Sequence, residues 1–292
     1  MARKSTRRIR PMVYPLSHEI MYRKLLLNHV RQMRISLRKH LLPIIPKLVK
    51  EAVDISLPSG DIIQDAEGWS DELNDALENV ANDMTRSSRI TIEESRKIGL
   101  DTNKFNLREW RGLIKREYGV DPVAENPQLY SQLLRNWSDT NARLISDIPA
   151  KTIRQIREQI TEALQTGRTI ADTAAAIKDI MEERMDVSDS RAELIARDQT
   201  AKLNGQLTEE RQAEIGVEQY IWRTVGDERV RDDHKDCDGE TFDWDGSSSL
   251  NGVSKPDGND PGEDFQCRCW AEPILPERLQ FEASLIEQEA LI

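Results

Sequence analysis

The sequence is poor in the residues that fill a large globular core. Aromatic side chains make up 5% of the 292 residues and hydrophobic side chains 38%, whereas charged side chains make up 32%. An average globular domain is more apolar and less charged than this. The balance argues against a single compact core and favours long helices with much exposed surface.

Long apolar runs and abundant cysteines are also missing. No stretch approaches the roughly 18 successive apolar residues of a membrane-spanning helix, and the Arg-rich start lacks the apolar centre of a signal peptide. We therefore expect a soluble protein that is not exported and has no membrane partner. Three cysteines, an odd and small number, are typical of a reducing compartment, where thiols stay free or bind metal.

Enzyme motifs are absent from the sequence as well. It contains no Gly-rich phosphate loop, no G-x-S-x-G and no H-E-x-x-H. Residues 227–264 carry 13 acidic residues against four Lys/Arg, but DWDG lacks the remaining ligands of an EF-hand loop. This composition predicts a solvated acidic loop and a protein that is not an enzyme.

Charge is distributed unevenly along the chain. The formal net charge is -11, yet residues 1–50 hold 13 Lys/Arg and the single acid Glu19, so the remaining 242 residues carry -23. A basic front end suggests nucleic acid or an acidic protein surface as partner. Residues 1–16 have no hydrophobic period and predict a flexible basic arm, whose candidate contact residues are Arg3, Lys4, Arg7, Arg8 and Arg10.

Helical periodicity runs through residues 17–148. Apolar residues recur at three- and four-residue steps over 17–42 until Pro43 and Pro46 interrupt the pattern, and further stripes cover 69–84, 105–118 and 129–149, the last ending at Pro149. His18, His29 and His40 recur every eleven residues and form one line. Because neighbours on that line are roughly 16 Å apart, the three cannot share one ion.

The chain from residue 149 to 276 reads as a second module. It begins with three predicted helices. The first covers 153–167, the second starts at the capping pair Thr169 and Asp172, and the third runs from the capping residue Ser188 to Gly216. Strand-like runs follow at 217–224, 240–244 and 265–275. We predict an α+β fold: an elongated helical region, then a helix-rich module that ends in a small antiparallel sheet with a long acidic loop. Residues 277–292 predict a short tail helix.

A histidine and three cysteines stand out in the second module. His234, Cys237, Cys267 and Cys269 offer the nitrogen and sulfur donors of a structural zinc site, in the form H-x2-C followed by C-x-C. A metal at this point would clamp the two ends of the loop. Metal-free packing, a redox pair, or a cysteine nucleophile with His234 as base also fit the residues, although no third residue that would orient the histidine is evident. Arg229 and Arg231 beside the strand turn predict either a partner-binding rim or local ion pairs.

Four motifs carry a family resemblance. The runs RAELIARDQTAKLN, YIWRTVGDERVRDDH, DGETF and PGEDFQCRC resemble the Mu F-like head-morphogenesis family of tailed bacteriophages, from about Phe105 to Leu275. The family pattern falls on Arg191, Ala196, Arg197, Trp222, Asp227, Arg229, Arg231, His234, Gly239, Phe242, Cys267 and Cys269. The position of Cys237 departs from it, because the family more often has an apolar residue there.

The resemblance implies a structural protein of the virion. Family members are minor capsid proteins bound to the portal vertex inside the head, which act in procapsid assembly and in DNA packaging or delivery. The expected partners are the portal protein, scaffold or major capsid protein, and packaged DNA through the basic arm. Some relatives carry a C-terminal toxin domain, for which the stretch after Cys269 is too short. The rival hypotheses are a DNA-binding protein that acts through its arm, and a zinc or thiol enzyme.

Overall fold

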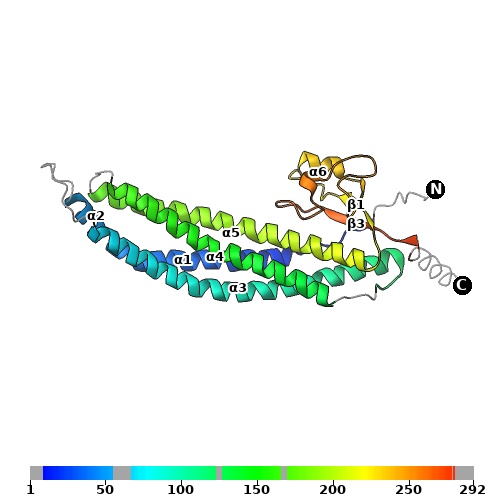
Figure 1. Ribbon diagram of the computed structural model, residues 1–292, viewed down its shortest axis with the longest axis horizontal. Helices are drawn as coiled ribbons and strands as arrows, with labels where there is room; N and C mark the ends of the chain where they lie inside the picture. Colours follow the sequence, from blue (N-terminus) through cyan, green and yellow to red (C-terminus); the bar gives the residue numbers. More distant parts are fainter. Residues whose placement is uncertain (1–8, 55–66, 123–126, 166–169, 278, 280–292) are drawn as a thin grey trace. The chain divides into compact units, whose positions relative to one another are not determined.

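The computed structural model describes residues 9–54, 67–122, 127–165, 170–277 and 279 (Figure 1). Its helices are α1 (Leu16–His40), α2 (Ile45–Asp54), α3 (Glu67–Tyr118), α4 (Pro127–Gln165), α5 (Ile170–Glu214) and α6 (Asp232–Cys237), with 3-10 turns at Leu42–Ile44 (η1) and Pro256–Gly258 (η2). The strands are β1 (Gln219–Arg223), β2 (Thr241–Asp243) and β3 (Trp270–Ile274). The predicted α+β class, mostly helical with a small antiparallel sheet, is confirmed.

The chain divides into two compact units. One, the helical unit, consists of residues 21–96 and 138–196, and the other, the sheet unit, consists of residues 1–20, 97–137 and 197–292. The boundary predicted at residue 149 does not coincide with this division, because α3, α4 and α5 each contribute residues to both units. Within the described residues, no helix combines the length and apolar character needed to cross a bilayer.

The apolar stripes predicted from the sequence form the core of the helical unit. In α1 they are Leu26, Val30, Met33 and Leu37, all buried, and α3, α4 and α5 each add further buried aliphatic residues. Polar ties cross this core: Ser36 donates to Asp83 at 2.9 Å, and Thr152 hydrogen-bonds Ser188 at 2.8 Å. Apolar periodicity therefore decided which faces pack, as it does in amphipathic helices generally.

Two predicted helix boundaries are wrong. Ser188 does not cap a helix; it lies inside α5, where its hydroxyl donates to the Arg184 carbonyl at 2.8 Å. Pro149 does not end a helix either, since α4 continues through it to Gln165. A proline in a helix lacks the N–H that would bond the carbonyl four residues earlier, here that of Ile145.

A histidine from α1 compensates for Pro149. His29 is buried and makes a backbone hydrogen bond to Ile145 that favours its protonated form, so the Ile145 carbonyl is the acceptor. His29 Nδ1 also lies 2.8 Å from the Ser87 hydroxyl. A partner from another helix thus satisfies the carbonyl that the proline leaves free. Burial lowers the pKa of His29 to about 4, so the ring is neutral at neutral pH.

The other two histidines of the predicted line have separate partners. His40 Nε2 lies 3.0 Å from Asp83 Oδ2, and the His18 ring packs against Phe105 with centroids 5.3 Å apart. The line is therefore not a shared site.

The sheet of the sheet unit has the order β2-β1-β3, antiparallel throughout, with Tyr220 opposite Phe242 and Trp222 opposite Ala271. Gly216 ends the turn after α5 with φ 79°, the left-handed conformation that glycine adopts without strain. Tyr220, Trp222 and Phe242 are fully buried in one cluster. Each of the three predicted strand regions thus contains a strand, and each strand is shorter than predicted, the third most of all.

A second cluster of the sheet unit includes part of the predicted arm. Ile9 and Met12 pack against the buried side chains of Trp110, Ile114 and Leu275. Residues 1–8 of the arm, the turn expected near Gly60, the cap residue Thr169, and most of the expected tail helix lie outside the described residues. The described end of the arm is therefore packed, whereas the prediction of flexibility for its first eight residues stays a prediction.

Candidate functional site

The site begins with α6, which carries His234 and Cys237. No helix is predicted there from the sequence, yet residues 232–237 form one short helix that follows the extended residue Arg231. Both side chains lie three residues apart on the same face of this helix and are buried. The second half of the site comes from the chain just before β3.

Cys267 and Cys269 lie in a turn and not on a strand, which corrects the prediction. The strand β3 starts only at Trp270. The Cys267 N–H donates to the Asp264 carbonyl at 2.9 Å, and Gln266 has φ 57°, an unusual value for a residue with a side chain. The Gln266 N–H donates to Asp198 Oδ1 of α5 at 3.2 Å. This bent backbone lets the two thiols converge, which a regular strand would not ensure.

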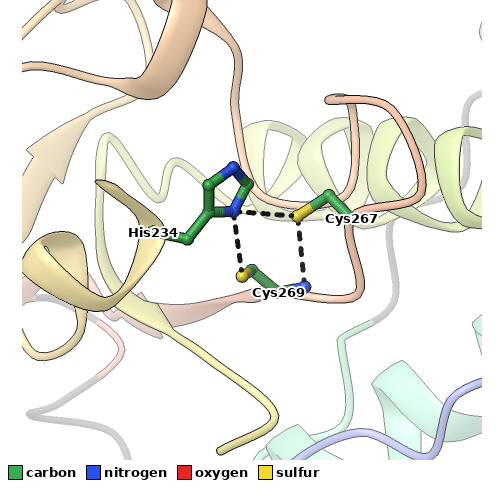
Figure 2. A group of neighbouring side chains, drawn as sticks. All are labelled: His234, Cys267 and Cys269. Carbon is green, nitrogen blue, oxygen red and sulfur yellow. Dashed lines mark hydrogen bonds between the residues drawn. The ribbon is translucent and has the colours of Figure 1, made fainter. Parts of the chain in front are cut away.

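His234, Cys267 and Cys269 meet around one point (Figure 2). His234 Nδ1 lies 3.4 Å from each of the two Sγ atoms, and the three donor atoms are all within 4.8 Å of one another. The exposed fractions are 3% for His234, 5% for Cys267 and 8% for Cys269. This group could hold a metal ion.

Cys237, the fourth predicted ligand, is not part of the group. Its thiol lies 3.7 Å from the Ser254 carbonyl, and the residue packs in the aromatic cluster of the sheet. Burial raises the pKa of Cys237 to about 11, so it stays a protonated thiol. Here a cysteine acts as a small apolar residue, which agrees with the apolar residue usual at this position in the resembled family.

Asp264 orients the histidine. Its Oδ2 lies 3.0 Å from His234 Nε2, on the side of the ring that faces away from the thiols. Arg231 binds the same carboxylate and also donates to the Phe265 carbonyl at 2.6 Å. Sequence reasoning found no such orienting residue. The only local signal was an acid three residues before the first cysteine of the C-R-C motif.

Electrostatics separate the two thiols. Hydrogen bonds from the side chains of Cys269 and His234 lower the pKa of the Cys267 thiol despite its burial. The hydrogen bond with Cys267 and burial both raise the pKa of the Cys269 thiol. For His234, burial opposes protonation, but Cys267 and Asp264 outweigh it and raise its pKa. Without a metal, the group therefore favours one thiolate beside a histidine.

A pocket of about 240 Å³ opens on the group and is rich in arginine. Arg231 and Arg268 line it and are paired with Asp264 and Asp227 respectively. Arg229 forms an ion pair with Asp227 at 3.2 Å. Arg229 and Arg231 thus form local ion pairs, and the partner-binding rim stays a prediction. Sequence reasoning missed Arg268 as a member of this pocket.

The predicted contact residues of the arm are only partly described. Arg10 is exposed, and its carbonyl accepts a hydrogen bond from Arg116 at 3.0 Å. Arg3, Lys4, Arg7 and Arg8 lie outside the described residues.

Comparison with known proteins places the site within a family. Residues 154–272 match the family described as Phage Mu protein F like protein. A curated protein of Haemophilus influenzae, described as an uncharacterized protein, is 30% identical over 224 residues, which are 75% of this chain and 47% of the relative. The chain thus spans about half the length of the curated relative it matches. No solved structure matches it.

The matched segment contains every residue of the site: Asp198, α6 with His234, the turn from Asp264 to Cys269, and most of β3. It also contains all four motifs in full. The resemblance read from the sequence is thereby confirmed for this part of the chain. Residues 154–272 form a module of the Phage Mu protein F like family.

Proposed function

We propose that this chain is a minor head protein of a tailed bacteriophage, which acts in head morphogenesis and is located in the virion at the portal vertex. The observation that carries this proposal is the match of residues 154–272 to the Mu F-like family. In this role the protein acts through surfaces and not through turnover. Its partners would be the portal protein, then scaffold or major capsid protein, and packaged DNA.

The fold supports a scaffold role in two ways. The helical unit has an aliphatic core, and it is tied across helices by side-chain pairs such as Arg34 with Asp189 at 3.1 Å and Arg191 with Asp147 at 2.6 Å. Helices of this length provide extended surfaces for protein contact. Each unit would present its own surface to a neighbouring protein.

The portal contact can be tested by co-expression with the portal protein of the same phage. We expect the two proteins to co-elute on size exclusion, and we expect assembled heads from an infection to contain the chain. Heads that assemble normally and lack the chain would contradict the proposal.

The contact with DNA can be tested through the basic arm. A variant with Gln in place of Arg3, Lys4, Arg7, Arg8 and Arg10 should bind DNA more weakly and with a smaller salt slope, because each lost phosphate contact lowers that slope by about 0.9. The matched control changes five exposed arginines elsewhere: Arg108, Arg135, Arg143, Arg154 and Arg157. Equal losses in both variants would indicate a general charge effect and not an arm. Tight DNA binding without any portal association would favour the DNA-binding hypothesis.

We also propose a structural zinc ion as the cofactor of the module. Two cysteines and a histidine are ligands that suit zinc. They come from α6 and from the turn before β3, so an ion there would connect the ends of the long loop between them. Such a connection stabilises a small sheet by tying its distant segments together.

A further inference from the structure

We infer that the ion at this site has three protein ligands, His234 Nδ1, Cys267 Sγ and Cys269 Sγ, and a fourth coordination position that opens onto the arginine-lined pocket and accepts water or a small anion. The inference rests on the proposed zinc ion. It differs from the four-ligand set that the sequence suggests, because it leaves Cys237 out and makes the site open.

The distances fit a tetrahedral ion. Zinc binds sulfur at about 2.3 Å and imidazole nitrogen at about 2.0 to 2.1 Å, so a nitrogen and a sulfur on one tetrahedral zinc lie about 3.6 Å apart. Both nitrogen-to-sulfur distances are 3.4 Å. The observed separations are therefore within about 0.2 Å of those that a tetrahedral zinc requires. No rotation of His234 is needed, since the same nitrogen faces both thiols.

The surroundings of the donors fit metal ligation as well. A histidine that binds metal through one ring nitrogen commonly donates its other N–H to a carboxylate, and Asp264 stands at that second nitrogen, 3.0 Å from Nε2. The Cys269 N–H donates to Cys267 Sγ at 3.3 Å, a contact that favours a thiolate.

Cys237 is excluded by what it already contacts. Its sulfur lies 3.7 Å from the Ser254 carbonyl, and it is outside the group of donor atoms from His234, Cys267 and Cys269 that lie within 4.8 Å of one another. The remaining histidines of the chain are all in α1. The protein ligands that the described residues bring together are therefore three, one fewer than a closed structural zinc site uses.

The open position faces the pocket. All three ligand residues line the same cavity, together with Arg197, Arg231 and Arg268. Two thiolates neutralise the charge of a zinc ion, so the net charge of the pocket depends on its other side chains. The guanidinium groups make it positive, and Asp227 and Asp264 offset that charge in part. A positive cavity beside an open coordination position selects water or a small anion such as a carboxylate. A carboxylate on a partner protein has the same chemistry.

The first experiment measures zinc per chain in the purified full-length protein, prepared in reducing buffer with zinc present. We expect about one zinc per chain, and strong loss in the variants His234→Ala, Cys267→Ser and Cys269→Ser. Cys237→Ala is the matched control, a buried cysteine of the same module, and it should keep its zinc. Asp264→Asn should bind zinc 10- to 100-fold more weakly, as is typical when an orienting carboxylate is removed. Circular dichroism identifies variants that fail to fold. If the ligand variants do not fold, the comparison of the single variants Asp264→Asn and Cys237→Ala still tests the inference.

The second experiment replaces zinc with cobalt(II), whose visible absorption reports coordination. Azide or formate should change the spectrum of the cobalt protein, and Arg197→Gln should weaken that response severalfold. Loss of metal from Cys237→Ala, or a cobalt spectrum that ignores added anions, would overturn the open three-ligand site while leaving the zinc proposal standing. A zinc-free wild-type protein would overturn both, and the portal assay would be unaffected by it.

Discussion

Gly205 of α5 offers a sharp test of how the cysteine turn is held. A Cβ atom on Gly205 would lie 2.9 Å from the Pro261 carbonyl oxygen and 3.5 Å from Gly262 Cα. The opposing atoms are backbone, so they cannot rotate away. The segment 261–262 can therefore lie against α5 only because residue 205 has no side chain, and this segment leads directly into the turn that carries Cys267.

The magnitude follows from two opposing effects of the change Gly205→Ala. Alanine in place of glycine favours a helix by about 0.5 to 1 kcal/mol. Overpacking against a fixed neighbour costs about 1 to 3 kcal/mol. We therefore expect a net loss of about 1 kcal/mol in the free energy of unfolding, within a range from about 0 to 2.5 kcal/mol. The loop must shift, so zinc affinity should fall as well.

The matched control is Gly112→Ala in α3. A Cβ atom at Gly112 would meet nothing within 4 Å, so only the helix effect applies. This variant should gain about 0.5 to 1 kcal/mol.

Urea denaturation followed by circular dichroism and by tryptophan fluorescence measures both variants under the same metal-replete conditions. Opposite signs for the two changes support the close approach of segment 261–262 to α5. If Gly205→Ala stabilises the protein as much as Gly112→Ala does, the packing argument is refuted.

Two further predictions concern buried polar groups. Arg211→Met removes a buried guanidinium that donates to Asn106 Oδ1 at 2.8 Å and to the Asn103 carbonyl at 3.3 Å. Because buried acceptors are left without a donor, the free energy of unfolding measured in urea should fall by about 3 kcal/mol. The control variant Lys104→Met, at an exposed position, should change that free energy little. His29 has a pKa of about 4 in the folded protein and about 6.5 when unfolded, so the unfolded chain takes up the proton first as pH falls. The free energy of unfolding should decrease by up to about 3 kcal/mol between pH 6.5 and pH 4 and stay level above that window. In His29→Gln most of this pH dependence should disappear, and an unchanged pH dependence would contradict the assignment.

Local pattern was enough for most of the fold. The apolar stripe from Leu26 to Leu41 predicts the buried face of α1, and the alternation around Tyr220 and Trp222 predicts β1, because periods of 3.6 and 2 follow directly from backbone geometry. Gly216 predicts the end of α5 because glycine adopts the left-handed conformation after a helix without strain. These signals lie within a few residues of the feature they determine.

Helix breaks were predictable only where nothing distant intervened. Pro149 would end a helix by its local chemistry, but His29, 120 positions earlier in the chain, bonds the Ile145 carbonyl that the proline leaves free. Ser188 has the chemistry of a cap, yet Thr152 of another helix gives its hydroxyl a partner inside α5. In both cases a tertiary contact outweighed a local preference.

The site, like the fold, was determined partly by local sequence and partly by tertiary contacts. The sequence by itself determined the donor types, since His234, Cys267 and Cys269 are the only histidine and cysteines of the module apart from Cys237. Only the tertiary structure decided which donors meet: the turn at Gln266, held by Asp198, brings the two thiols onto one nitrogen of His234, while the Cys237 thiol contacts the Ser254 carbonyl instead. Spacing along a chain fixes which residues are available, whereas convergence in space depends on backbone angles and on contacts from distant segments.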